Sequence, residues 1–430
     1  MHTVSAKVFS PVALSQKASL IERYAEVRLA TEALCAPLAA DDQMVQSAPE
    51  TSPVKWHQAH TTWFFETFIL TPHLAGYRPV DPAYRALFNS YYKQTGGHPL
   101  RSIRHTFSRP TLPEVRQYRR HVDEEMARLL AQDVGGASSL ASLMELGINH
   151  EQQHQELILT DIKHAFWTSP VQPAYWSRAL AEQARAELPE LRWLDFEGGL
   201  LEIGHRGEAF AFDNEGPRHN VYLEPFRIAS RLVTNGEYLE FMKAGGYRRP
   251  ELWLSDGWDA VQANQWEAPL YWERGDGGWV MFTLGGIREV RAADPLCHVS
   301  YYEADAFARW AGARLPRESE WEIAAAHLPV EGNLLETGRF HPAQAGSDGL
   351  TQMFGDVWEW TASPYDAYPG FQAAAGALGE YNGKFMCNQF VLRGGSCATP
   401  RTHIRATYRN FFPPQARWQF MGVRLANGRS

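Results

Sequence analysis

Two histidines spaced four residues apart, His150 and His154, are the first candidates for chemistry in this chain. They lie in a segment that predicts a helix, where side chains at positions i and i+4 share one face, one turn apart. Two imidazoles placed in this way can bind one metal ion. Glutamines and glutamates crowd the same turn, so a solvated polar helix face with two incidental histidines is the alternative.

A third imidazole comes from the segment WHQAHTTWFFE, in which His60 precedes an aromatic run at 63–65. The run predicts a buried helix, and a buried histidine needs a hydrogen bond or a metal ion as its partner. Three histidines from two helices would leave positions open for substrate and oxygen, as non-heme iron requires. His57 lies three residues earlier, and the residue pattern leaves it open as the ligand instead.

Residues 150–154 read HEQQH and also match HExxH, in which Glu151 would be the general base of a zinc hydrolase. The longer metzincin form of this motif requires a glycine and a histidine downstream. Leu157 and Thr160 occupy those places. A glutamate ligand further along the chain, such as Glu182, stays open.

Four predicted helices position these histidines, at about 15–34, 53–70, 112–133 and 138–166. Ser15 is a possible N-cap of the first helix, and Pro53 suits the first turn of the second. The polar stretch DVGGASS connects the last two helices. This pattern favours an up-and-down helical bundle.

The character of the sequence changes near residue 190, after which Gly, Pro, Trp and Tyr become frequent. This pattern predicts a loop-rich α+β domain, with short helices at 302–312 and 317–326. A chain of 430 residues also exceeds the usual size of one compact core. We therefore expect two domains, 1–185 and 186–430.

Composition and charge limit the classes of binding partner and the cellular compartment that we expect for this protein. The net charge is -8 with no long Lys/Arg block, which argues against nucleic acid. No apolar run approaches the ~20 residues of a membrane helix, and the N-terminus does not read as a signal peptide. Four cysteines without a CxxC pair argue against a disulfide framework. We expect a cytoplasmic monomer or small homo-oligomer that acts on small molecules.

Motifs spread over nearly the whole chain carry a family resemblance. They include AHTTWFFE, LFNSYY, HEQQHQE, FDNEGPRH, GDVWEWTASPY, EYNGKFMCNQFVLRGGSCATP and IRATYRNFFPPQARWQFMGVRLA. Together they resemble the sulfoxide synthases of ergothioneine biosynthesis, which are hercynine-dependent non-heme iron enzymes. The resemblance implies an α+β fold with an N-terminal DinB-like four-helix bundle. It also implies a C-terminal domain similar to formylglycine-generating enzymes, with a C-type-lectin-like fold.

The resemblance also implies a reaction and its ligands. Enzymes of this family use Fe(II) and O2 to join a thiol sulfur to the imidazole C2 of Nα-trimethylhistidine (hercynine), and they oxidise the sulfur to a sulfoxide. The family pattern assigns the iron to His60, His150 and His154. It follows that O2 is expected as a co-substrate.

Further residues follow from matched positions. Gln153, Asn410 and Phe411 would contact hercynine, and an aromatic ring suits its quaternary ammonium. Tyr91 or Tyr92, of the NSYY motif, would donate a proton to the oxygen intermediate.

The chain departs from its relatives where the second substrate would bind. One branch of the family binds γ-glutamylcysteine through an acidic residue and an arginine, and here Phe412 and Ala416 stand in those places. The segment 104–110, which begins at Arg104, differs from the RGLLSRP of relatives and would line the same pocket. The expected donor is cysteine or γ-glutamylcysteine. A selenosugar, the donor of the related selenoneine synthases, is the alternative.

The second domain allows an alternative function and contains a possible copper motif. Lectin-like folds often only bind, so a non-enzymatic binding module is a further alternative to an oxygenase or a zinc hydrolase. Cys397 follows an RGGS motif, but the second cysteine of a copper pair is missing there, so we expect Cys397 and Cys387 to be buried small residues. Arg393, Asp356 and Glu359 are expected to form polar contacts of the fold.

Overall fold

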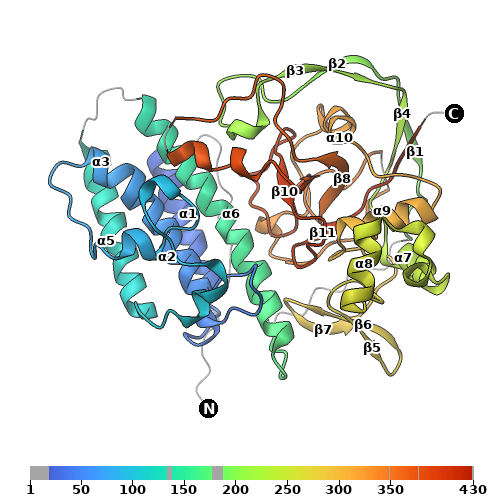
Figure 1. Cartoon of the computed structure of the whole chain (residues 1–430), viewed down its shortest axis with the longest axis horizontal. Helices are drawn as coiled ribbons and strands as arrows, with labels where there is room; N and C mark the ends of the chain where they lie inside the picture. Colours follow the sequence, from blue (N-terminus) through green and yellow to red (C-terminus); the bar gives the residue numbers. More distant parts are fainter. Residues whose placement is uncertain (1–18, 133–137, 177–186, 348, 376, 429–430) are drawn as a thin grey trace.

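Helices fill the N-terminal half of the chain, and short strands joined by long loops fill the C-terminal half, in a computed structural model (Figure 1). The structure describes residues 19–132, 138–176, 187–347, 349–375 and 377–428. The expected α+β organisation is confirmed. The expected boundary after residue 185 and most of the DVGGASS connection lie outside the described residues, so the boundary stays a prediction.

Four helices form the N-terminal bundle, close to their predicted positions: α1 (Leu20–Cys35), α2 (Val54–Phe65), α5 (Leu112–Ala131) and α6 (Ser138–Thr168). α2 packs against α5 and α6, and α6 packs against α1. The N-cap of α1 is Ser19, whose hydroxyl and Glu22 carboxylate form a capping box. The predicted cap, Ser15, lies outside the described residues. Among the described residues, no helix is long and apolar enough to cross a membrane.

The connection from α2 to α5 carries several candidate site residues. α2 continues into a π-helical turn, Glu66–Leu70, and two short helices follow, α3 (Thr71–His73) and α4 (Tyr84–Leu87). A 3-10 turn, Arg101–Thr106, then returns the chain to the bundle. Tyr91 and Tyr92 precede this turn and Arg104 lies in it, so the connection places them beside α2.

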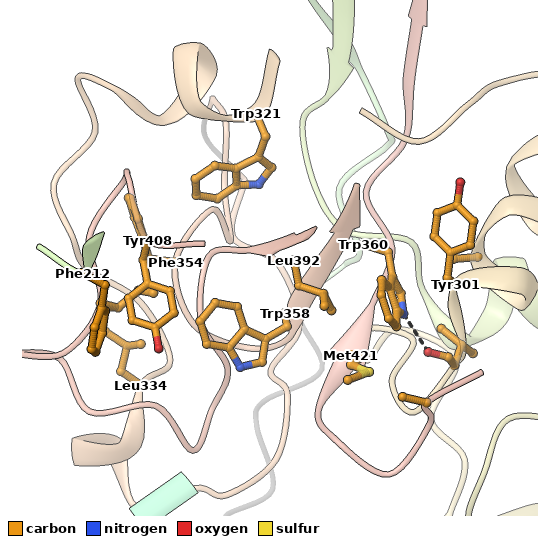
Figure 2. Packing of buried hydrophobic residues seen from close by; sticks show 14 of the residues in the cluster. Phe212, Tyr301, Trp321, Leu334, Phe354, Trp358, Trp360, Leu392, Tyr408 and Met421 are labelled. Atoms are coloured by element: carbon orange, nitrogen blue, oxygen red, sulfur yellow. Dashed lines mark hydrogen bonds between the residues drawn. The ribbon is translucent and has the colours of Figure 1, made fainter. Parts of the chain in front are cut away.

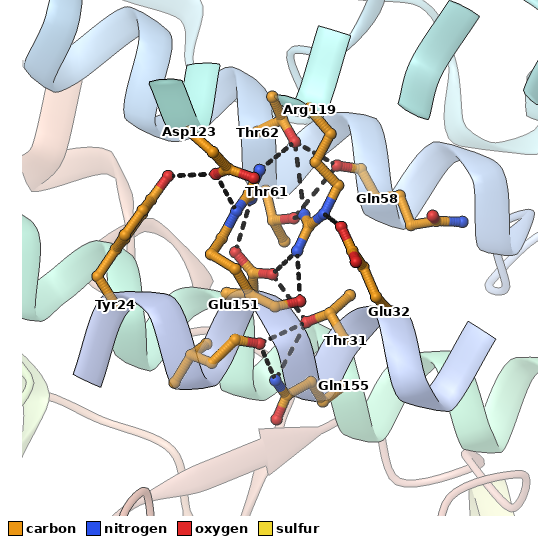
Figure 3. Close-up of polar contacts among 12 residues, drawn as sticks. Tyr24, Thr31, Glu32, Gln58, Thr61, Thr62, Arg119, Asp123, Glu151 and Gln155 are labelled. Carbon is orange, nitrogen blue, oxygen red and sulfur yellow. Dashed lines mark hydrogen bonds and ion pairs between the residues drawn. The ribbon is translucent and has the colours of Figure 1, made fainter. Parts of the chain in front are cut away.

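A buried charge network joins the bundle helices on the side of α6 away from the C-terminal domain (Figure 3). The Glu151 carboxylate from α6 accepts hydrogen bonds from Arg28 of α1 at 2.9 Å and from Arg119 of α5 at 2.5 Å. Arg28 also donates to Thr62 Oγ1 of α2 at 3.1 Å. Removing one member of such a network leaves a buried charge without compensation. The network therefore fixes the relative positions of α1, α2, α5 and α6.

The C-terminal domain is built from small sheets with helices around them. Its helices are α7 (Asn235–Lys243), α8 (Ser255–Asn264), α9 (Tyr301–Trp310) and α10 (Glu318–Ala325). The predicted helices at 302–312 and 317–326 correspond to α9 and α10. The four-stranded sheet has the order β10 (Asn410–Phe412), β9 (Phe390–Arg393), β8 (Trp358–Pro364) and β11 (Met421–Gly422). It is therefore β10 that presents the candidate residues 410–412.

Three smaller sheets complete this domain. One has the order β1 (Trp193–Phe196), β4 (Phe226–Ala229) and β12 (Ala426–Gly428). A second pairs β2 (Gly199–Ile203) with β3 (His219–Leu223). The third has the order β5 (Trp272–Gly275), β6 (Gly278–Thr283) and β7 (Gly286–Glu289).

Indole rings fill the core around β8 (Figure 2). Trp358 and Trp360 of this strand are buried, and Trp360 Nε1 donates to the Val299 carbonyl at 2.9 Å. Buried ion pairs lie beside these rings: Glu359 accepts from Arg424 Nε at 2.8 Å. The indole rings of β8 are therefore part of the core of this domain.

The three polar residues expected to support the fold make buried contacts. Arg393 pairs with the carboxylate of Glu322, and Glu359 pairs with Arg424. Asp356 accepts from the Asn333 side-chain amide at 2.7 Å. None of these three lines the cavity described below.

The four cysteines are free thiols. Cys397 is buried, as predicted, but Cys387 is exposed, so that expectation was wrong for Cys387. Cys387 lies in the loop after a 3-10 turn that ends at Phe385, where the chain runs along the surface.

α6 is also the helix that holds the two domains together. Its Glu156 carboxylate accepts from Trp358 Nε1 at 2.8 Å and from Thr399 Oγ1 at 2.7 Å, and from the Ser396 hydroxyl. Further along, Lys163 Nζ lies 2.6 Å from His298 Nε2. Figure 1 shows α6 along the side of the bundle that faces the C-terminal domain.

Candidate metal centre and active site

His60, His150 and His154 converge in the interior. A nitrogen of each ring lies within 4.8 Å of a nitrogen of each of the others. The three side chains are buried, with residual exposures of 1%, 3% and 8%. α2 supplies His60, and successive turns of α6 supply the other two. The spacing that suggested a shared helix face therefore brings the pair to one point, opposite His60.

The orientation of His60 is fixed by its surroundings. Its Nδ1 lies 2.6 Å from the Phe88 carbonyl oxygen. Because a carbonyl only accepts, Nδ1 carries the proton and Nε2 is left with its lone pair. The indoles of Trp56 and Trp63 stack on the ring at 4.5 and 5.5 Å. The imidazole is held with a free nitrogen available to the centre.

The pair on α6 also fits a metal ion. His150 Nε2 and His154 Nε2 are 3.1 Å apart. Two nitrogens that bind one ion at about 2.1 Å and at a right angle are about 3.0 Å apart. Burial lowers the pKa of all three imidazoles, that of His150 to about 3. The rings are therefore neutral, which is the form that binds a metal.

His57, the alternative ligand, lies behind this centre. Its Nδ1 is 2.8 Å from His154 Nδ1, and its Nε2 is 3.0 Å from Asp161 Oδ2. Both ring nitrogens are thus occupied, and His57 is not among the converging ligands. The structure brings His60, not His57, to the pair on α6.

The glutamate of the HExxH match does not reach the centre. Glu151 is fully buried in the bundle network, where Arg28 and Arg119 bind its carboxylate. A general base must instead contact the water or substrate at the metal. This geometry argues against a zinc hydrolase. Glu182, its possible third ligand, lies outside the described residues.

A cavity of ≈ 340 Å³ opens beside the three imidazoles, between the two domains. Most of the candidate site residues line it: Tyr91, Arg104, Gln153, Asn410, Phe411 and Phe412. Tyr92 does not line it, because its side chain is fully buried behind Tyr91. Residues distant in the sequence therefore share one pocket.

Gln153 is held by two tyrosines of the C-terminal domain. Its Nε2 donates to the Tyr408 hydroxyl at 2.7 Å, and its Oε1 accepts from the Tyr381 hydroxyl. His403 Nε2 lies 3.0 Å from the same Tyr408 hydroxyl. Sequence reasoning did not single out Tyr381, Tyr408 or His403. The only signal was that Tyr381 and Tyr408 lie within motifs of the family resemblance.

Tyr91 presents a protonated phenol to the cavity. Burial raises the pKa of Tyr91 and of Tyr92, so both keep their protons at neutral pH. The Tyr91 hydroxyl donates to the Tyr92 hydroxyl at 3.5 Å. Lys384 lies over the Tyr91 ring, 4.5 Å from its centroid, and fixes the ring from the C-terminal domain.

Arg104 is a buried cation on the wall of the cavity. Its guanidinium lies 3.3 Å from the centroid of the Trp56 ring and donates to Ser52 Oγ at 2.8 Å and to Ser90 Oγ at 3.1 Å. It forms no ion pair within the described part of the chain. Burial lowers the pKa of Arg104, with a smaller contribution from Arg101. An anionic group entering the cavity would compensate this charge.

Aromatic rings form the facing wall. Phe411 stacks on Tyr365 with ring centroids 4.0 Å apart, and Phe412 meets Trp418 edge-on at 5.5 Å. Ala416, which follows in the next loop, is buried and does not line the cavity. Phe411, Phe412 and Trp418 therefore present apolar rings to the cavity.

Comparisons with known proteins agree with this architecture. The DinB superfamily model matches residues 23–158, and the sulfatase-modifying factor enzyme 1-like domain model matches residues 177–337 and 336–429. The chain is 32% identical over 225 residues to a formylglycine-generating enzyme of Thermomonospora curvata, a match that covers 40% of this chain and 70% of that relative.

Two relatives match along nearly the whole chain. The hercynine oxygenase of Mycobacterium tuberculosis is 32% identical over 416 residues, which cover 89% of this chain and 92% of the relative. That of Mycolicibacterium thermoresistibile is 31% identical over 411 residues, covering 89% and 88%. Both domains and the three converging histidines agree with this relationship. The chain therefore belongs to the hercynine oxygenase family of non-heme iron enzymes.

Proposed function

We propose that this enzyme forms a carbon–sulfur bond between the imidazole C2 of hercynine and a small thiol, with Fe(II) held by His60, His150 and His154. The observation that carries the proposal is the convergence of three neutral imidazoles on a cavity between two domains. The bound iron would supply the site at which O2 is reduced.

The atoms and electrons of this reaction balance. The hercynine C2–H bond and the thiol S–H bond break, a C–S bond forms, and the sulfur gains one oxygen atom. Each of these two oxidations removes two electrons, and O2 accepts all four. One oxygen atom ends in the sulfoxide and the other leaves as water with the two hydrogens.

The residues of the cavity divide the remaining tasks. Gln153, Asn410 and Phe411 would hold hercynine, and the ring of Phe411 suits a trimethylammonium group. Tyr91 would hold the proton that reaches the reduced oxygen, because its phenol lines the cavity and that of Tyr92 does not. A general acid must come within hydrogen-bond reach of the atom that it protonates, so it must face the cavity.

The donor would bind at the Arg104 end of the cavity. Its guanidinium forms no ion pair with any residue that the structure describes, and so favours a donor that carries a carboxylate. Neither Phe412 nor Trp418, which line the facing wall, offers a partner for the second charged end of γ-glutamylcysteine. Free cysteine is therefore the proposed donor.

The same wall favours a second candidate, a selenosugar donor that would give selenoneine chemistry at the same carbon. An uncharged sugar ring would lie against Phe412 and Trp418 without requiring an ion pair. The two serine hydroxyls bound to Arg104 already place neutral oxygen atoms at this end of the pocket.

The test is donor-dependent turnover by the anaerobically iron-loaded enzyme. Hercynine would be mixed with cysteine, γ-glutamylcysteine, a selenosugar or no donor, and air then admitted. O2 uptake and product mass are the readouts. We expect hercynine-dependent uptake with cysteine, and a product with one oxygen more and two hydrogens fewer than the sum of the substrates. Turnover with the selenosugar alone would select the second candidate, and no uptake with any donor would refute both.

A further inference from the structure

A second row of buried polar groups supports the metal centre from behind. His154 Nδ1, on the side of the ring away from His150, lies 2.8 Å from His57 Nδ1. The other nitrogen of His57 lies 3.0 Å from Asp161 Oδ2. His57 is 2% exposed and Asp161 5%. α2 and α6 are therefore connected by a chain of three side chains that ends at a carboxylate.

The Asp161 carboxylate determines which nitrogen is the donor in each hydrogen bond of this row. Asp161 already accepts from the Ser52 amide at 2.8 Å and from Trp418 Nε1 at 3.2 Å. A carboxylate surrounded by donors is an acceptor throughout, so His57 Nε2 carries a proton toward it. A neutral imidazole has only one N–H, which leaves His57 Nδ1 as an acceptor. His154 Nδ1 must then be the donor, and His154 Nε2 keeps its lone pair toward the centre.

We infer that His57 and Asp161 are positioning residues of the metal centre. They hold His154 in the tautomer and ring orientation that present Nε2 to the ion. The carboxylate also makes Nε2 a stronger electron-pair donor to the metal. Outer partners of this kind commonly orient metal-binding histidines and raise their basicity. This inference rests on the proposed function, because it takes His60, His150 and His154 as the iron ligands.

The arrangement treats the ligands unequally. His60 donates to a neutral carbonyl, that of Phe88, whereas His154 donates through His57 to a carboxylate. Of these two ligands, His154 is therefore the one whose row of hydrogen bonds ends at a carboxylate. Trp418 links Asp161 to the C-terminal domain, so the orientation of this ligand also depends on the wall of the substrate cavity.

Metal binding by the full-length, metal-free protein tests this inference without any turnover. Fe(II) would be titrated anaerobically against a competing chelator, and Co(II) absorption would report the ligand geometry. His57→Phe removes both hydrogen bonds. His57→Asn keeps an acceptor oxygen near the Nδ1 position but loses Asp161, and Asp161→Asn removes only the charge. We expect about 10–100-fold weaker binding for His57→Phe, with the other two variants between it and the wild type.

A matched control comes from the C-terminal domain. His341 is another buried histidine beside a carboxylate, with Nε2 3.5 Å from Asp294 Oδ2, and it does not line the cavity. His341→Phe should bind Fe(II) as tightly as the wild type. Thermal unfolding of each metal-free variant would establish that it folds.

The outcomes separate this inference from the proposed function. Wild-type affinity and an unchanged Co(II) spectrum in His57→Phe would overturn the positioning role. Should that variant not fold, unchanged affinity in both His57→Asn and Asp161→Asn would overturn it equally. If the wild type binds Fe(II) no more tightly than His60→Ala does, the three-histidine site itself fails, and the proposed function fails with it.

Discussion

His57 and His60 lie three residues apart on α2, yet only His60 directs a free nitrogen toward His150 and His154. The difference comes from their partners, a backbone carbonyl for His60 and a histidine with a carboxylate for His57. The same holds for the adjacent phenols. Tyr91 lines the cavity, whereas Tyr92 packs behind it. The role of each of these residues therefore depends on the partners and the position of its side chain, and not on the residue type alone.

The tyrosine pair gives a prediction at this scale. Tyr91→Phe should slow product formation by about 100-fold or more, because it removes a phenolic proton at the cavity. Its iron content should not change, since Tyr91 is not a ligand. Tyr92→Phe is the matched control and should keep most of the activity. Single-turnover product formation at equal iron loading would measure both, and equal losses would contradict the assignment to Tyr91.

At the scale of the element, α6 contacts three different parts of the molecule through three sets of side chains. His150 and His154 face the centre, Glu151 enters the bundle network, and Glu156 binds the C-terminal domain. A helix places these groups around its axis within two turns. The two histidines of the HExxH pattern therefore belong to the metal centre, and its glutamate belongs to the buried ion network. The two roles are independent of each other.

This interpretation predicts a loss of stability when Glu151 is neutralised. Glu151→Gln removes the carboxylate that Arg28 and Arg119 share, which leaves Arg28 with Asp123 and Arg119 with the more distant Glu32. The loss of this buried partner should lower the free energy of unfolding by about 3 kcal/mol. Denaturant unfolding of the metal-free protein would measure this. Glu145→Gln, on the same helix, loses the more exposed pair with Arg23 and should cost at most about 1 kcal/mol. A folded, fully stable Glu151→Gln protein that lacks activity would instead favour a general base.

Helices were the part of the fold that the sequence could predict. Apolar spacing located α2, α5 and α6 to within a few residues, since each helix buries one stripe. The start of α1 was missed because Ser15 was taken as its N-cap, although Ser19 and Glu22 form the S-x-x-E capping box.

The site was only partly predictable, for a physical reason. His150 and His154 follow from helical periodicity, which is a local rule. Choosing between His57 and His60 required their tertiary partners, which no spacing encodes. Tyr381 and Tyr408 come from loops with no period at all, and only the folded chain brings both to Gln153.

At the scale of the whole molecule, the cavity exists only because two domains meet along α6. The bundle supplies the imidazoles, and β10 supplies Asn410, Phe411 and Phe412. Glu156 is the strongest described link between them, since three donors of the C-terminal domain bind its carboxylate. Substrate binding should therefore depend on this junction more than metal binding does.

Glu156→Ala tests that dependence. It removes all three hydrogen bonds and should weaken hercynine binding by at least about tenfold, the equivalent of one charge-assisted hydrogen bond of about 1.5 kcal/mol. The affinity for Fe(II) should change much less, because the three ligands belong to the bundle. Calorimetric titration of each ligand would compare the two.

A second contact between the domains provides the control. Glu273→Gln alters the exposed hydrogen bond from Trp167 Nε1, 2.9 Å long, and should leave both affinities unchanged. Equal loss of hercynine and iron affinity in Glu156→Ala would show that the mutation acts on the bundle rather than on the junction.

The central claim is that one iron ion is held by three imidazoles from two helices of the bundle. Its most direct test is the iron content of the anaerobically reconstituted protein and of single alanine variants. We predict a single iron ion per chain in the wild type, and loss of iron in His60→Ala, His150→Ala and His154→Ala. His403→Ala, which removes another buried histidine of the cavity, should retain the metal. Full iron retention in any of the three ligand variants would contradict the account.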